Sequence, residues 1–145
     1  SNISNFVVER LRHYDIAKQV VFEILEDESI ESLERVAIFI DRVKRMGCKI
    51  AIDDFGTGYS NFSYLLKLKP DYIKVDGSLI KALDKDTNSL AIVSAIITFA
   101  KKLGIKTIAE YVHNERVYEL CLELGIDEFQ GFYLGEPSAR LKEKV

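Results

Sequence analysis

The sequence predicts an α/β domain built around a parallel sheet. Short apolar runs alternate along the chain with longer segments in which apolar residues recur at helical spacing. The runs are apolar almost throughout, which is typical of strands that are buried on both faces. Strands separated by helices connect through right-handed crossovers, so neighbouring strands are expected to run in the same direction.

Five strands are expected, because five short runs are rich in β-branched or aromatic residues. The first, residues 20–25, is interpreted as a buried strand, and the second follows at residues 49–53. The remaining strands are expected at residues 71–75, 106–109 and 129–134.

Helices are expected where apolar residues form a single stripe, as Leu33, Val36, Ile40 and Val43 do. They span residues 5–18, 30–46, 88–103 and 114–124, with a short helix after Pro137. Glycine commonly ends a helix, and the last three of the longer helices are followed by Gly47, Gly104 and Gly125.

A sequence pattern recurs along the chain. Residues 46–53 align with residues 103–110, since both pass from a helix end through glycine into an apolar strand that finishes on a carboxylate. A third, shorter copy begins at residue 124 and reaches Gln130. The repeat supports one continuous domain of alternating helices and strands.

Polar residues lie at or near the downstream ends of all five expected strands: Glu23, Asp53, Lys74, Glu110 and Gln130. The carboxyl ends of parallel strands are where α/β barrels and open α/β sheets collect their active sites. The pattern therefore predicts one shared site. The alternative is a set of unrelated surface charges.

Asp53 and Asp54 form an acidic pair at a strand end. Adjacent strand residues point to opposite faces, so both carboxylates reach one site only if the chain bends, which the following glycines allow. Two close carboxylates repel unless a cation lies between them, and hard oxygen ligands favour magnesium or manganese. The alternative is that one aspartate caps the turn. Residues 56–58, Gly-Thr-Gly, match no phosphate-binding fingerprint and are interpreted as a mobile loop.

Three charged residues stand within or directly after apolar strands. Lys74 lies between Ile73 and Val75, and it is expected to need a carboxylate or phosphate partner. Glu23 and Glu110 are costly in such surroundings unless a metal ion or a salt bridge compensates their charge.

Composition excludes several other classes of protein. The net charge is −3, with 20 Lys plus Arg against 23 Asp plus Glu, so there is no signal for binding nucleic-acid polymers. The two cysteines form no CxxC pair, which argues against a disulfide framework or a zinc site of that pattern. No apolar stretch is long enough to span a bilayer, and no Ser/His/Asp arrangement stands out.

Five ordered motifs resemble those of the EAL-domain cyclic di-GMP phosphodiesterases. Residues 53–60, Asp-Asp-Phe-Gly-Thr-Gly-Tyr-Ser, resemble the family's DDFGTGYS loop. The other matches are residues 23–26 to the E-x-x-E strand end, residues 70–76 to P-D-x-I-K-x-D, Ala109-Glu110 to A-E-x-V, and residues 130–132 to Q-G-[YF]. The resemblance covers nearly the whole chain.

The resemblance implies a modified (β/α)8 barrel that hydrolyses cyclic di-GMP to the linear dinucleotide in bacterial signalling. It implies that Glu23, Asp53 and Asp54 bind two Mg2+ or Mn2+ ions, with Asp53 bridging them. Two such ions would clamp the phosphodiester and stabilise the charge of the displacement.

The resemblance also assigns roles to four other residues. Lys74 would hold the attacking water or the phosphate, and Glu110 would bind the second ion or act as the base. Gln130 would steady the site or the substrate, and Glu26 would anchor the loop at residues 55–60.

The sequence departs from the family in two ways. His113 stands where the family usually has a second acid three residues after Glu110. The E-x-L motif and the asparagine metal ligand are absent, and a closed barrel needs about 200 residues or more. Residues 1–145 are therefore expected to be one partial EAL domain, the C-terminal part of a barrel, that lacks its N-terminal strands and is inactive alone.

An incomplete barrel leaves open sheet edges, which tend to pair with other strands. We expect a homodimer or pairing with the missing barrel half, and a cytoplasmic location that is compatible with a membrane anchor upstream. The alternative function is a non-catalytic receptor for cyclic di-GMP or a protein. The ligands retained within the chain favour the enzyme.

Overall fold

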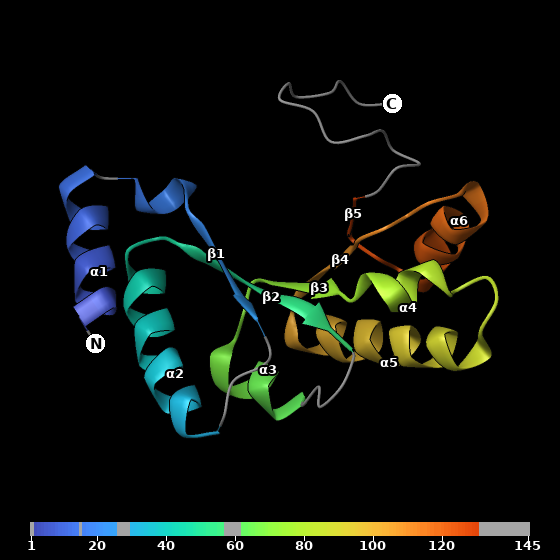
Figure 1. Ribbon diagram of the computed structural model, residues 1–145, viewed down its shortest axis with the longest axis horizontal. Coiled ribbons are helices and arrows are strands. Elements are labelled where there is room, and N and C mark those ends of the chain that lie inside the picture. Colours follow the sequence, from blue (N-terminus) through green and yellow to red (C-terminus); the bar gives the residue numbers. More distant parts are fainter. Residues whose placement is uncertain (1, 15, 26–29, 57–61, 131–145) are drawn as a thin grey trace.

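Five parallel strands form one sheet in the order in which they occur along the chain (Figure 1). They are β1 (Val21–Leu25), β2 (Lys49–Phe55), β3 (Tyr72–Val75), β4 (Lys106–Ala109) and β5 (Glu128–Phe129). The structure is a computed structural model that describes residues 2–14, 16–25, 30–56 and 62–130. An order without reversal is that of an arc of a (β/α)8 barrel, whereas a doubly wound sheet reverses at its switch point. Among the residues that the structure describes, the predicted number and direction of strands are confirmed.

Helices connect the strands, and none in the described part of the chain is both long and apolar enough to cross a membrane. They are α1 (Asn2–Tyr14), the 3-10 helix η1 (Ala17–Gln19), α2 (Ile30–Arg45), α3 (Phe62–Leu68), α4 (Gly77–Lys81), α5 (Thr87–Leu103) and α6 (Glu115–Leu124). The helix expected at residues 5–18 is α1, which ends earlier than expected, at Tyr14. The short helices α3 and α4 were not predicted, because seven and five residues are too few to establish a helical period.

Local side chains fix the ends of the two helices near the carboxyl end of the chain. The side chains of Asp86 and Asn114 accept backbone N–H bonds in the first turns of α5 and α6. Gly104 and Gly125 end these helices with φ of +71° and +94°, a conformation in which a Cβ atom would be strained. The helix ends predicted from these glycines are confirmed. The part of the last expected strand beyond residue 130 and the helix after Pro137 lie outside the described residues.

The main core lies between one face of the sheet and the helices. Ile50, Ile52, Ile73 and Val75 are buried on that face, and α2, α3 and α5 lie on one side of the strands (Figure 1). Because side chains alternate along a strand, the residues between them point to the opposite face. The opposite face therefore carries the polar residues that were expected to form a site.

β1 is less buried than expected. Val21 is 50% exposed, and the side chain of Glu23 is 51% exposed, so the prediction of a strand buried on both faces is wrong for β1. The physical reason is position, since within the described residues β1 pairs with β2 on one side and forms the edge of the sheet.

Two aspartates hold connecting loops against the amino ends of neighbouring strands. Asp71, just before β3, accepts a hydrogen bond of 2.8 Å at Oδ2 from the N–H of Ile50. Asp127, just before β5, accepts one of 2.8 Å at Oδ2 from the N–H of Thr107. The backbone N–H of each aspartate donates back to the carbonyl of the same partner. The same pair of hydrogen bonds at β2 and β4 extends the repeat seen in the sequence.

Replacing Asp71 with alanine is expected to lower the free energy of unfolding by about 1–3 kcal/mol, because the N–H of the buried Ile50 loses its acceptor. Urea unfolding measures the change. The exposed Asp84 supplies a control, since Asp84→Ala is expected to change stability by less than about 0.5 kcal/mol. Equal effects of the two substitutions would show that the Asp71 contact contributes nothing.

Candidate active site

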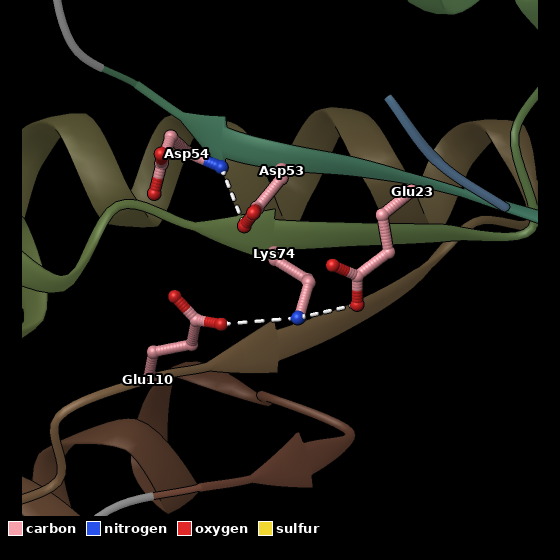
Figure 2. A network of polar contacts seen from close by, with 5 residues as sticks. All are labelled: Glu23, Asp53, Asp54, Lys74 and Glu110. Atoms are coloured by element: carbon pink, nitrogen blue, oxygen red, sulfur yellow. Dashed lines mark hydrogen bonds and ion pairs between the residues drawn. The ribbon is translucent and has the colours of Figure 1, made fainter. Parts of the chain in front are cut away.

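Lys74 joins two carboxylates that come from different parts of the sheet (Figure 2). Its Nζ lies 2.7 Å from Oε1 of Glu23 on β1 and 3.1 Å from Oε1 of Glu110, which directly follows β4. The expectation that a lysine inside an apolar strand has an acidic partner is confirmed. So is the expectation that these three residues meet.

Lys74 keeps its positive charge in this position. Its side chain is 11% exposed, and burial by itself lowers the pKa of the amine. The hydrogen bonds to Glu23 and Glu110 and their charges outweigh burial, so the pKa of Lys74 is raised. The stability that this contact adds is therefore present below about pH 10.5 and is lost as the pH rises through the raised pKa. At neutral pH Lys74 is a hydrogen-bond donor and not a base.

A bend at the carboxyl end of β2 places Asp54 beside Asp53. The register between β2 and β3 shifts between Ile52 and Phe55, and Asp54 has a φ of +52°. Aspartate tolerates this left-handed conformation better than most residues do. The predicted bend is confirmed, although it begins at Asp54 itself and not at the glycines that follow.

Three carboxylates converge next to Lys74. One oxygen each from Asp53, Asp54 and Glu110 lie within 4.8 Å of one another. Burial raises the pKa of Asp54, and the charges of Asp53 and Asp76 raise it further, while Lys74 lowers it. A divalent cation would remove this repulsion, and carboxylate oxygens are ligands that Mg2+ and Mn2+ prefer. The donor set therefore fits such an ion.

Asp53 also stabilises the turn, which was the alternative to metal binding. Its Oδ1 accepts a hydrogen bond of 2.9 Å from the N–H of Asp54. This bond occupies one side of the carboxylate and fixes the bend. Turn stabilisation and membership of the acidic cluster are thus both present in one side chain.

Asp76 is a member of the acidic group that the sequence reasoning did not select. It follows β3, and its Oδ1 accepts a hydrogen bond of 2.7 Å from the N–H of Ser78. Its charge is close enough to raise the pKa of Asp54. A signal existed in the sequence, because Asp76 is the last residue of the motif matched by residues 70–76.

Gln130 lies at the same edge of the sheet as Glu110. Its N–H donates to the carbonyl of Ala109 at 2.7 Å, and its carbonyl accepts from the N–H of Val112 at 3.1 Å. The side chain of Gln130 is exposed. The predicted loop anchor, Glu26, and residues 57–61 of the loop lie outside the described residues.

A surface hollow of about 360 Å³ lies near the amino ends of the strands. Its lining includes Pro70 and Ile105, which come just before β3 and β4, together with Leu65 and Lys44. The carboxylate cluster lies at the carboxyl ends of the strands. The hollow is therefore separate from the cluster.

Comparison with known sequences agrees with this geometry. Residues 1–137 match the family model of the EAL domain. Over 132 residues the chain is 37% identical to the cyclic di-GMP phosphodiesterase PdeF of Escherichia coli (strain K12). The match covers 90% of this chain and 18% of PdeF, so the chain spans a minor part of that protein.

Solved structures give the same result. The EAL domain of Mycobacterium smegmatis DcpA is similar with a TM-score of 0.84 and 32% identity, over 94% of this chain and 62% of that one. BlrP1 of Klebsiella pneumoniae, solved with manganese and cyclic di-GMP, is similar with a TM-score of 0.81 and 32% identity. That match covers 92% of this chain and 34% of BlrP1. The family match along most of the chain and the likeness in structure together show that the chain belongs to the EAL domain family.

Proposed function

We propose that the protein carrying this chain is a phosphodiesterase that hydrolyses cyclic di-GMP to the linear dinucleotide with the help of Mg2+ or Mn2+. The observation that carries the proposal is the convergence of Asp53, Asp54 and Glu110 beside a charged Lys74. It is supported by the name of PdeF and by the manganese and cyclic di-GMP complex of BlrP1. Residues 1–145 would form one part of the catalytic domain.

The carboxylates would divide between two ions. Glu23 and Asp53 would hold the first, Asp54 and Glu110 would hold the second, and Asp53 would contribute to both. Glu23 has an oxygen on Lys74, and its side chain is half exposed, so its second oxygen is available for a ligand. When bound, the ions would supply Lewis-acid stabilisation of negative charge on the phosphodiester oxygens.

Lys74 would act as a fixed hydrogen-bond donor. Its ammonium group is held by Glu23 and Glu110, and its third N–H would donate a hydrogen bond to a phosphate oxygen or to the oxygen of the attacking water. Water adds its oxygen to phosphorus, one P–O ester bond breaks, and the leaving oxygen takes a proton. Glu110 lies 3.1 Å from Lys74 and is placed to accept a proton from that water if it does not bind an ion.

Gln130 and Glu26 would act outside the acidic cluster. The side chain of Gln130 is exposed at the edge of the sheet, where an amide can hydrogen-bond a substrate that lies over the strand ends. Glu26 is proposed to anchor the loop at residues 55–60, on the strength of the sequence motif alone.

The proposal is tested by incubating the full-length protein with cyclic di-GMP and Mn2+ or Mg2+ and separating the products by chromatography. The linear dinucleotide is expected, and EDTA is expected to stop its formation because the acidic cluster then lacks its cations. Recovery of intact cyclic di-GMP from a protein that binds it would overturn the enzyme and support the receptor.

Two further parts of the proposal concern the setting of the domain. The exposed edge of β1 is proposed to pair with a strand from elsewhere in the same protein or from a second copy. Light scattering separates the two, since a monomer at every concentration would exclude the second copy.

Cys48 and Cys121 are buried free thiols, which fits the reducing cytoplasm that we propose as the location.

A further inference from the structure

Tyr111 combines a strained backbone with an exposed ring. Its φ is +58°, a left-handed conformation that is an outlier for a bulky residue. The residue is 56% exposed, so burial of the ring is not what stabilises this conformation. It directly follows Glu110 at the carboxyl end of β4. Strain of this kind concentrates at functional sites.

The backbone of Gly77 supports the ring of Tyr111. A Cβ atom built on Gly77 would lie 2.0 Å from Cδ2 and 2.7 Å from Cε2 of Tyr111, so the edge of the ring lies directly against the glycine. Gly77 follows Asp76, whose charge acts on Asp54. The ring is therefore held between the carboxyl ends of β3 and β4, at the edge of the sheet where the carboxylates converge.

We propose that Tyr111 is a platform on which one guanine base of the substrate stacks, an inference that rests on the proposed function. Aromatic side chains bind nucleobases through their faces. The edge of the ring, at Cδ2 and Cε2, contacts Gly77, while much of the residue remains open to solvent. Because the ring is already oriented by the glycine, binding a base costs little ordering of the side chain.

The test uses three variants of the full-length protein, with KM and kcat for cyclic di-GMP and the melting temperature as readouts. Tyr111→Phe keeps the ring and is expected to keep KM within about threefold of the wild-type value. Tyr111→Leu and Tyr111→Gly remove the aromatic face and are expected to raise KM about tenfold or more while kcat changes little. Tyr111→Gly is also expected to raise the melting temperature, since glycine adopts this φ without strain, so weaker binding would not reflect unfolding.

Unchanged KM in Tyr111→Leu and Tyr111→Gly would overturn the platform, and so would a KM raised equally in Tyr111→Phe. The platform and the proposed function fail separately. If the wild-type protein binds cyclic di-GMP without hydrolysing it, the dissociation constant measured by calorimetry replaces KM. The same pattern among the three variants then supports the platform although the proposed enzyme activity is wrong.

Discussion

Replacing Asp53 with asparagine is expected to reduce the turnover of cyclic di-GMP by about a thousandfold or more, which is several kcal/mol of transition-state stabilisation. Asparagine has nearly the same shape, and its amide oxygen can still accept the N–H bond of Asp54 that fixes the bend. The loss would therefore come from the missing charge in the acidic cluster and not from the fold. Values of kcat for both proteins measure the effect, with circular dichroism to confirm folding.

The control for Asp53→Asn is Asp84→Asn, which removes the same charge from an exposed position after α4. This control is expected to retain wild-type turnover. Turnover of Asp53→Asn close to that of the control would contradict a role for Asp53 in holding a catalytic cation.

Replacing Lys74 with methionine is expected to abolish measurable turnover and to lower the free energy of unfolding by about 1–3 kcal/mol. Methionine preserves much of the length of the side chain but leaves Glu110, which is 18% exposed, without its cation. The half-exposed Glu23 contributes less, because water can solvate it. Chemical unfolding and kcat are measured on the same preparations.

The double variant Lys74→Met with Glu110→Gln separates the two effects. Neutralising Glu110 removes the uncompensated charge, so stability is expected to recover by more than half while turnover stays absent. A double variant no more stable than Lys74→Met would contradict the account of the ion pair. Turnover in either variant would contradict the account of Lys74 as a donor.

The sequence was sufficient to predict the sheet and the convergence of the site. The strands are apolar runs, of which β2, β3 and β4 are largely buried, and the carboxyl ends of parallel strands necessarily share one edge. That rule brought Glu23, Lys74 and Glu110 together in the prediction, and the structure has them in contact. The resemblance to the family motifs then indicated the reaction, hydrolysis of cyclic di-GMP.

Features that depend on contacts between distant segments were not predicted. The packing of Tyr111 on Gly77 joins two strand ends and leaves no periodic pattern in the sequence. The left-handed conformation of Asp54 was also not predicted, because two adjacent aspartates are compatible with several allowed backbone conformations. The bond from Ile50 to Asp71 likewise depends on the register between neighbouring strands.

Binding of Mn2+ by calorimetry, with the wild-type full-length protein and its Asp54→Asn and Asp84→Asn variants, tests most directly whether carboxylates from separate strands share a divalent cation. We expect Asp54→Asn to weaken binding at least about tenfold, because it removes one anionic ligand from the cluster. Asp84→Asn is expected to bind Mn2+ as the wild-type protein does. Equal Mn2+ affinity in all three proteins, or no binding by the wild type, would contradict a metal site at Asp53, Asp54 and Glu110.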